Sequence, residues 1–246
     1  MSLDLLREHR RVFAEKAVLG EVYGVWFDRL LDRLPRHGLV LEAGAGPGLF
    51  RPHAHKVRPD LRWVALDLIE APWNDVVADA QFLPFRAGCF DAVVGIDFIH
   101  HLATPLGFFR EAARVLKPGA ELRVVEPWVS PFSYPIYRLF HQEGATLGLD
   151  ALRPFQQGDA KKPFDGDAGV TRSIRAGVDA AAWRRLGFSG GARLTKINGF
   201  AYLLSFGFKA PSLLPRFLAP PLIALDRLLP AGLTAMRVEL RARTPL

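Results

Sequence analysis

Cysteine and methionine are scarce in this chain of 246 residues, which has one of the first and two of the second. The single cysteine, Cys89, excludes an internal disulfide framework and is typical of a reducing compartment. The stretch from Met1 to Arg11 is charged and has no apolar core of the kind that a secretory signal needs. We therefore expect a cytoplasmic protein.

Motifs for metals and for nucleotide phosphates are also missing. No group of His, Cys and carboxylate residues stands at the spacing of metal ligands, so the sequence predicts no metal site. The phosphate-binding pattern G-x-x-x-x-G-K, followed by Ser or Thr, does not occur either. The sequence thus favours a ligand that is held without a metal and without a phosphate cradle.

Positive charge exceeds negative charge, with a formal net charge of +7 and a sequence pI of about 9.9. Such a balance is compatible with an anionic partner. The basic residues, however, are mostly arginines scattered among acids, and only Lys161 and Lys162 form a tight lysine pair. No stripe of basic and aromatic residues marks a nucleic-acid interface, so we expect no nucleic-acid partner.

The most informative segment is Leu39–Gly48, where an apolar run ends at Glu42 and three glycines follow at every second position. The run predicts a buried strand, and the glycines predict a turn at which the backbone approaches a ligand closely. A dinucleotide loop would need a further glycine in the pattern G-x-G-x-x-G, but Leu49 or Arg51 stands at that position. The spacing therefore excludes a dinucleotide site.

Further strand patterns follow this loop in order. They cover Trp63–Asp67 and Val76–Ala80, then Asp91–Ile96 and Leu122–Glu126. Between the last two, Phe109–Gly119 predicts a helix that ends at a Pro-Gly pair. Together these patterns indicate an α/β domain.

The pattern E-x-G-x-G-x-G and the ordered segments from about Val40 to Glu126 resemble the class I S-adenosylmethionine-dependent methyltransferases, in particular their type 11 small-molecule group. The resemblance implies S-adenosylmethionine as the cofactor and S-adenosylhomocysteine as its product. It also implies an α/β fold with a doubly wound, mostly parallel, seven-stranded sheet of the Rossmann-like type, with N-terminal helices and lid insertions.

The resemblance further implies roles for single residues. Asp67 ends the second strand, where a carboxylate can accept both ribose hydroxyls. Asp79 would face the adenine amino group, and the Ala80 amide would face a ring nitrogen. Tyr23, on an N-terminal helix, would reach the cofactor's carboxylate or else is a core residue. The predicted cofactor-binding residues are Tyr23, Glu42, Gly44, Ala45, Gly46, Gly48, Asp67, Leu68, Asp79, Ala80, Ile96, Asp97 and His101.

Methyl transfer from a sulfonium needs mainly proximity, alignment and desolvation, and it needs a base only when the nucleophile must lose a proton. His141, with Glu143 nearby, is the first candidate for this base, because an imidazole near an acid can be ready near pH 7. Glu126 and His100 are the further catalytic candidates. The alternatives are that Glu126 holds a loop, that His100 packs structurally, and that His141 and Glu143 lie on a solvated helix face.

The rest of the chain surrounds this core. Helices are predicted over Leu3–Leu34, Ile136–Glu143 and Val178–Leu186, and strands six and seven over Ala192–Ile197 and Met236–Arg243. We predict one domain over 1–246, made of an N-terminal helical cap (1–37), a cofactor-binding core (38–126), an acceptor-side lid and helix (127–190), and strands six and seven with an apolar insertion (191–246).

The insertion itself, residues 199–233, is mostly apolar and stands where a short hairpin would suffice. Arg216, Asp226, Arg227 and internal prolines interrupt it, so it is not a membrane-spanning helix. Three interpretations stay open: a roof over an apolar acceptor pocket, a peripheral contact with a membrane interface, or a homodimer contact. If it is a roof, the residues lining the cavity are Phe206, Phe208, Leu213, Leu214 and Phe217.

The sequence as a whole predicts a methyltransferase that acts on a small, lipophilic molecule at oxygen, nitrogen or carbon. An RNA or protein methyltransferase is the first alternative, and it is favoured only by the net charge. A non-catalytic S-adenosylmethionine-binding protein is the second.

Overall fold

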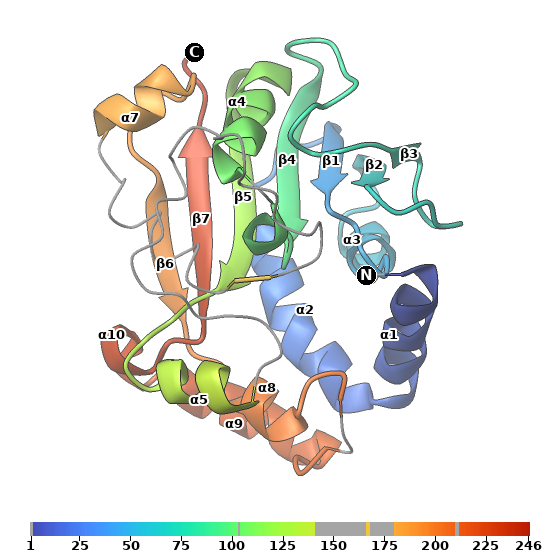
Figure 1. Ribbon diagram of the computed structural model, residues 1–246, viewed down its shortest axis with the longest axis vertical. Coiled ribbons are helices and arrows are strands. Elements are labelled where there is room, and N and C mark those ends of the chain that lie inside the picture. The colour runs from blue at the N-terminus through green and yellow to red at the C-terminus, as the bar shows by residue number, and fades with distance from the viewer. Residues whose placement is uncertain (1, 103, 141–165, 168–179, 210–211) are drawn as a thin grey trace.

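The computed structural model describes residues 2–102, 104–140, 166–167, 180–209 and 212–246. A single sheet with helices on both faces forms its centre (Figure 1). The strands are β1 (Leu39–Ala43), β2 (Arg62–Asp67), β3 (Val76–Val77), β4 (Phe90–Ile96), β5 (Leu116–Pro127), β6 (Arg193–Ile197) and β7 (Arg237–Arg243).

The strands follow the order β3-β2-β1-β4-β5-β7-β6. The first five are parallel, whereas β7 is antiparallel to both β5 and β6. This confirms the predicted doubly wound, mostly parallel, seven-stranded sheet. The parallel strands run toward the lower end of Figure 1, so their carboxyl ends meet at that edge, where ligands of open α/β sheets bind.

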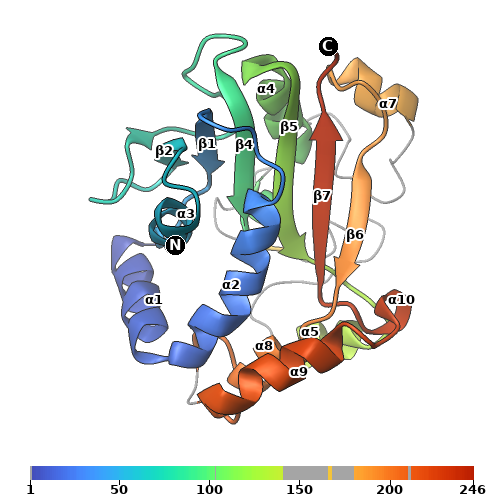
Figure 2. The same ribbon diagram turned by 180° about the vertical axis from the view of Figure 1, so that it is seen from behind.

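The helices are α1 (Leu3–Glu15), α2 (Ala17–Leu31), α3 (Phe50–Val57), η1 (Ile99–His101, a 3₁₀ turn), α4 (Pro105–Val115), α5 (Ser133–Phe140), α7 (Ala180–Arg185), α8 (Phe200–Ser205), η2 (Arg216–Leu218, also 3₁₀), α9 (Ala219–Asp226) and α10 (Ala231–Thr234). Helices α4 and α7 cover one face of the sheet, and α2 and α3 cover the other (Figures 1 and 2). Helices α5, α8, α9 and α10 gather beyond the carboxyl ends of the parallel strands.

Successive strand residues point to opposite faces, and both faces are covered, which explains the nearly continuous apolar strand sequences. Val40 and Ala92 pack toward α2 and α3, whereas Leu41 and Val93 pack toward α4. All four side chains are completely buried.

Two strands, β3 and β5, differ from the prediction by more than one residue. β3 ends at Val77 rather than Ala80, and β5 begins at Leu116 rather than Leu122. The left-handed backbone of Gly119 (φ +72°) lets the chain bulge within β5, so the Pro-Gly pair bends this strand instead of preceding it.

The predicted single N-terminal helix is two helices, α1 and α2. Lys16 separates them with a non-helical backbone (φ −103°, ψ 75°), and its ammonium donates to the Gly207 carbonyl at 2.6 Å. No glycine or proline marks this break, so helical periodicity continues through it. Of the two helices, α1 buries only Leu6, whereas eight residues of α2 are buried.

A buried arginine fixes the end of α2. Arg123 of β5 donates to the carbonyls of Arg29 (3.1 Å), Leu30 (3.5 Å) and Asp32. Carbonyls in the last turn of a helix lack partners within the helix, and positive charge there is favourable. The central strand β5 therefore holds the helix that carries Tyr23.

The helix α5 begins at Ser133 rather than at Ile136, because Pro135 falls in its first turn, where a missing N–H costs nothing. The described part of α5 ends at Phe140, so His141 and Glu143 lie outside the described residues. Within the described ranges, no helix is long and apolar enough to cross a membrane.

Candidate active site

The loop between β1 and α3 contains three glycines with left-handed backbone: Gly44 (φ +67°), Gly46 (+51°) and Gly48 (+64°). A Cβ at Gly44 would overlap the side chain of Phe98, and one at Gly48 would overlap that of Trp73. A Cβ at Gly46 would have its nearest neighbour 3.9 Å away. Two glycines are thus required for packing, whereas the middle one faces open space into which a ligand can fit.

This loop crosses over the end of β2. The Ala45 amide donates to the Leu66 carbonyl (3.0 Å), and the Gly46 amide donates to Oδ2 of Asp67 (2.8 Å). The other carboxylate oxygen of Asp67 accepts the amide of Ile69 at 2.9 Å. Burial raises the pKa of Asp67, although these backbone amides oppose the shift. Each oxygen keeps lone-pair capacity, so Asp67 can accept further hydrogen bonds from a ligand.

Glu42 is the most unusual group at this edge. Its side chain is buried at the end of β1, and within the described residues its Oε2 atom has no hydrogen-bond partner. Burial raises the pKa of Glu42 to about 8; Arg51 opposes this shift, and Asp67 and Asp75 add to it. A buried acceptor without a partner costs about 1–3 kcal/mol, so this atom marks a place for a donor or a positive charge from a ligand.

Helix α1 covers the outer side of the loop through Arg10. Its guanidinium donates to the carbonyls of Pro47 (2.8 Å) and Gly48 (3.0 Å), and it lies 4.5 Å from the ring centroid of Trp73. The indole of Trp73 in turn donates to the Gly46 carbonyl at 2.8 Å. Sequence reasoning missed both Arg10 and Trp73. Arg10 was missed because it lies on a charged helix whose residue pattern is that of a solvent-exposed helix.

The predicted adenine-side residues lie next to β2. The Ala78 amide donates to the Asp67 carbonyl (3.0 Å), which brings Asp79 and Ala80 beside Asp67. The Asp79 carboxylate accepts the backbone amide of Gln81 at 2.8 Å. Ala80 is buried, whereas Leu68 is exposed at the end of β2.

A cluster of aromatic and charged groups follows β4. Asp97 has a left-handed backbone (φ +54°), pairs with Arg237 of β7, and accepts the hydroxyl of Tyr23 at 3.5 Å. The Arg237 guanidinium lies 4.4 Å from the Trp26 ring centroid and 4.9 Å from that of Tyr202. Burial would lower the pKa of Arg237, but Asp97 together with the surrounding tyrosines outweighs it and holds that pKa well above its usual value.

Tyr23 is therefore both a core residue and a neighbour of the predicted site residue Asp97. Burial raises the pKa of Tyr23 well above its usual value, so its hydroxyl remains a donor. Sequence reasoning missed Arg237 and Tyr202, because Arg237 joins this cluster only through the position of β7 beside β5, and Tyr202 only through the packing of α8 against Trp26.

Glu126, at the end of β5, has a full set of partners. Its Oε1 accepts the amides of Phe98 (2.9 Å) and Ile99 (2.8 Å), and its Oε2 lies 2.5 Å from Nδ1 of His100. Burial would raise the pKa of Glu126, but His100 and the two amides hold it below its usual value. The geometry favours the loop-holding interpretation for Glu126.

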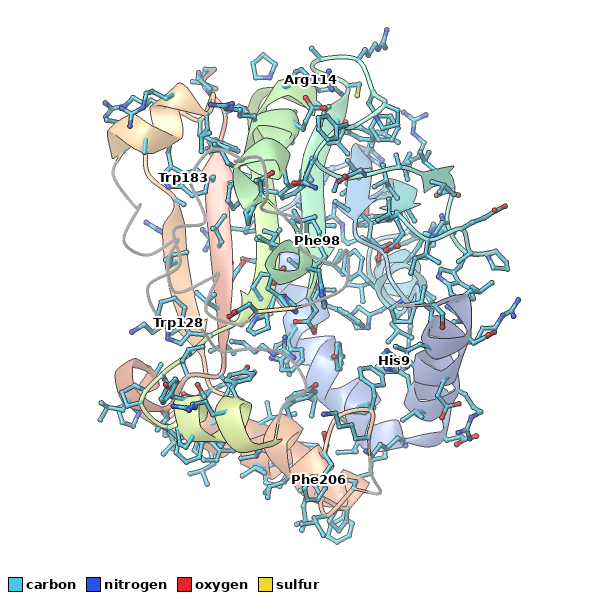
Figure 3. The ribbon with its side chains drawn as sticks, in the orientation of Figure 1. His9, Phe98, Arg114, Trp128, Trp183 and Phe206 are labelled. Atoms are coloured by element: carbon cyan, nitrogen blue, oxygen red, sulfur yellow. The ribbon has the colours of Figure 1, made fainter. Side chains whose placement is uncertain are left out.

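The remaining predicted residues lie around this turn. Ile96 ends β4 and is half-buried, and the rings of His100 and His101 lie 4.2 Å apart. Figure 3 shows Phe98 in the middle of the molecule, near the carboxyl ends of the strands. The structure thus brings the glycine loop and the ends of β2, β4 and β5 to one edge, whereas the proposed base pair, His141 and Glu143, lies outside the described residues.

The apolar insertion differs from the roof that was one of its three interpretations. Leu214 is buried and Phe208 is half-buried, with its ring stacked on His9 at 4.6 Å. Phe206, Leu213 and Phe217 are exposed, so the expectation that they line a cavity is wrong for these three. The insertion packs on the rest of the protein mainly through Ala201, Tyr202, Leu214 and Ala219, which leaves its large side chains outward.

A surface depression of about 400 Å³ lies at the opposite edge of the sheet. It is lined by Leu34, Arg36, His37, Arg58 and Asp60, which precede β1 and β2. It includes none of the predicted site residues, and an ion pair between Arg58 and Asp60 (2.7 Å) occupies part of its lining. Its position speaks against a role in binding the cofactor.

One known protein family matches this chain, and the match lies in the first half of the sequence. Residues 41–124 match the family model described as "Methyltransferase domain". The chain is 34% identical to the tRNA (carboxymethyluridine(34)-5-O)-methyltransferase alkbh8 of Xenopus tropicalis over 102 residues, which are 37% of this chain and 16% of that protein. It is 33% identical to malonyl-acyl-carrier protein O-methyltransferase of Legionella pneumophila over 107 residues, 36% of this chain and 37% of that protein. The chain thus spans well under two thirds of the length of these relatives.

Solved structures resemble nearly the whole chain. A chain from the complex between the Haloferax volcanii Trm112 methyltransferase activator and a methyltransferase has a TM-score of 0.57 at 15% identity, covering 97% of this chain and 98% of its own. A SAM-dependent methyltransferase from Thermotoga maritima has a TM-score of 0.56 at 17% identity, with coverages of 98% and 97%. At such identities the likeness establishes the fold.

Proposed function

We propose that this chain, an S-adenosylmethionine-dependent methyltransferase of the class I fold, methylates a small apolar acceptor at the carboxyl edge of its sheet. The observation that carries the proposal is the buried carboxylate of Glu42, whose unpartnered oxygen lies beside a glycine loop with open space at Gly46. An acid in that position has a raised pKa and is stabilised by a ligand that brings positive charge or hydrogen-bond donors.

The residues at this edge fit S-adenosylmethionine. That cofactor carries an ammonium group, a sulfonium and ribose hydroxyls, and it has no phosphate. Asp67 would accept the ribose hydroxyls, and Glu42 would face the positive charge or a donor group. When bound, the cofactor would supply a methyl group on a positively charged sulfur: a lone pair of the acceptor would form the new bond to the methyl carbon as the carbon–sulfur bond opposite it breaks, and the sulfur would leave as the neutral thioether of S-adenosylhomocysteine.

The surroundings of Asp97 support an apolar acceptor. The rings of Tyr23, Trp26 and Tyr202 pack together there, and the charges of Asp97 and Arg237, which lie in this cluster, neutralise each other. Tyr23 and Trp26 are buried, so water is excluded from this cluster, and surroundings of this kind favour an apolar molecule near the methyl donor. If the nucleophile must lose a proton, His141 assisted by Glu143 is the proposed base.

RNA is a second candidate acceptor, because several relatives are tRNA methyltransferases. Their similarity, however, covers little more than a third of the chain. Many arginines in the described residues are also paired with acids, such as Arg11 with Glu8 and Arg114 with Glu111. These observations favour the small acceptor.

Binding of S-adenosylhomocysteine, measured by titration calorimetry, tests the cofactor site. Asp67→Ala should weaken binding by roughly tenfold or more, because a hydrogen bond to a charged group contributes about 1.5–3 kcal/mol. Gly46→Val should abolish it by filling the open space of the loop. Asp60→Ala, an acid at the opposite edge of the sheet, is the matched control and should bind like the wild type. Absence of binding by folded wild type would overturn the proposal.

Labelled methyl transfer tests the acceptor class. The protein is incubated with S-adenosylmethionine carrying a tritiated methyl group, together with either an organic-solvent extract of cells or total RNA. We expect label in small, solvent-extractable products. Label in RNA alone would replace the small acceptor with the second candidate.

A further inference from the structure

We propose that the apolar end of this protein, formed by the end of α8 and by η2, α9 and α10 (residues 204–206 and 213–233), docks on the surface of an anionic lipid bilayer. These elements lie together beyond the carboxyl ends of the parallel strands in both views of the ribbon (Figures 1 and 2). Phe206 lies at the outer extremity of this end, pointing away from the sheet (Figure 3).

Large apolar side chains are exposed along the whole apolar end. Leu228 exposes 80% of its surface, Phe217 76% and Leu213 69%. Further exposed members are Leu204, Phe206, Leu218, Leu225 and Leu233. Monomeric proteins rarely expose so many neighbouring apolar groups, and a concentration of this kind marks a contact surface.

Helix α9 shows the exposure of apolar side chains most clearly. Its sequence, Ala-Pro-Pro-Leu-Ile-Ala-Leu-Asp, is apolar on every side, yet only its end residues Ala219 and Asp226 are buried. A helix that is apolar all round requires an apolar environment, either a protein core or lipid. The described residues cover only part of α9, and the proposal assigns the rest of this helix to lipid.

The charges on the apolar end indicate which phase this is. Residues 199–233 contain three cationic residues, Lys209, Arg216 and Arg227, and a single acid, Asp226. Asp226 is buried, where it accepts the amides at the start of α8 (3.3 and 3.4 Å). Exposed charge contributed by this stretch is therefore positive, which is complementary to anionic lipid headgroups.

The same charges argue against a second copy of this chain as the partner. Most homodimers are formed about a two-fold axis, so that one patch meets itself. In such a contact the patch of each copy, which carries Arg216 and Arg227 and to which the insertion contributes no exposed acid, would meet the same cationic patch of the other copy. Glu21, from α2, is 3.0 Å from Arg216 and is the acid that the structure places beside this end.

Docking in this orientation would place the carboxyl edge of the sheet toward the bilayer. This part of the inference rests on the proposed function, because it gives an apolar acceptor a route from the lipid to the site. The docking itself can be tested without any activity. Binding of S-adenosylhomocysteine by the same variants then shows whether a failure concerns the membrane surface or the cofactor site.

Flotation with vesicles tests the docking, using phosphatidylcholine alone or mixed with phosphatidylglycerol. We expect wild type to float with the mixed vesicles and to lose binding as salt is raised. Phe217→Asp should lower the affinity by roughly tenfold or more, since burying a large apolar side chain contributes about 1.5–3 kcal/mol. Arg227→Ala should lower it about fivefold, because each arginine near an anionic surface contributes about 1 kcal/mol.

The matched control is Phe82→Asp, a phenylalanine exposed to 78% after β3 and away from the apolar end; it should float like the wild type. Leu228→Asp repeats the test if Phe217→Asp does not fold, as judged by circular dichroism. Folded wild type that floats with neither vesicle would overturn the proposal. So would a dimer in light scattering that Phe217→Asp converts to a monomer, with vesicle binding unchanged.

Discussion

Two glutamates lie buried at the same edge of the sheet, and their surroundings are opposite. Glu126, at the end of β5, accepts two backbone amides and contacts His100, and its pKa is lowered. Glu42, at the end of β1, has an oxygen without a partner in the described protein, and its pKa is raised to about 8. Burial alone therefore does not decide the state of either acid; the partners do.

The difference separates a structural anchor, Glu126, from Glu42, which we propose as a binding group. Glu126 fixes the turn that follows β4, and with it the position of Phe98 against Gly44. Oε2 of Glu42 has no hydrogen-bond partner within the described residues, and the burial of this atom is unfavourable until a ligand supplies one. A buried acid with a perturbed pKa and an unpartnered oxygen is a candidate functional group, and on this we base its proposed role in cofactor binding.

Removing the anchor should have the largest effect. Glu126→Ala leaves two amides and the His100 ring without their acceptor, so we expect a loss of about 3–5 kcal/mol in the free energy of unfolding, measured in urea. Glu126→Gln keeps one oxygen for the amides and should lose less. A loss below about 1 kcal/mol for Glu126→Ala would contradict its role as an anchor.

Glu42→Gln should act in the opposite direction and raise stability. In the unfolded chain the Glu42 carboxyl ionises near its ordinary 4.5, whereas in the folded protein it keeps its proton until about pH 8. The folded state thus binds more protons in this window, and wild-type stability falls as pH rises through it. The variant should be more stable by roughly 2–4 kcal/mol at pH 7, with a difference that shrinks toward pH 4.

Chemical unfolding of wild type and Glu42→Gln at several pH values measures this difference. Calorimetry should show weaker S-adenosylhomocysteine binding by the variant, because an amide cannot compensate a positive charge. A variant that gains stability and binds as well as the wild type would refute the assignment of Glu42 to the cofactor.

The general base of the proposed reaction can be assigned by comparing a variant of His141 with a variant of Glu126. His141→Ala should lower turnover by roughly 100-fold with unchanged cofactor affinity if His141 takes a proton from the acceptor. Glu126→Gln, once its stability loss is corrected for, should then retain most of the turnover. Full activity in His141→Ala, together with a large loss in Glu126→Gln, would transfer the role to β5.

The smallest expected effect is on the glycine loop. Gly46→Ala and Gly88→Ala both place a Cβ at a left-handed residue with open space around it, at φ +51° and +63°. Each should lose about 1–2 kcal/mol of stability from backbone strain. Only Gly46→Ala should also weaken S-adenosylhomocysteine binding, as measured by calorimetry. Equal binding by both variants would show that the open space at Gly46 is not used.

The first half of the chain could be predicted well from its sequence because its signals are local. An apolar run, a following acid and closely spaced glycines define the end of β1, and similar runs define β2 and β4. The carboxyl ends of parallel strands must meet at one edge, so Glu42, Asp67 and Asp97 could be expected there. The bulge in β5 and the break at Lys16 were not predictable, because the residues around them allow more than one backbone path.

Contacts between residues far apart in the sequence could not be predicted, because they depend on how the whole chain folds. The pair formed by Asp97 and Arg237 joins residues 140 positions apart and depends on β7 lying beside β5. Likewise, the apolar composition of residues 199–233 shows that these side chains need an apolar environment, but it does not show which of them face the protein and which face outward. Only the packing of Ala201 and Ala219 inward reveals that Phe217 faces outward.

The weak attachment of α1 has a consequence for the rate at which the site exchanges its contents. This helix buries a single leucine and holds the glycine loop mainly through the guanidinium of Arg10. Segments with so little buried apolar surface open with a free energy far below that of global unfolding. Backbone amides of α1 should therefore exchange with deuterium much faster than those of α2. If the chain has the function we propose, opening of α1 about the break at Lys16 would give the product a way out of the site.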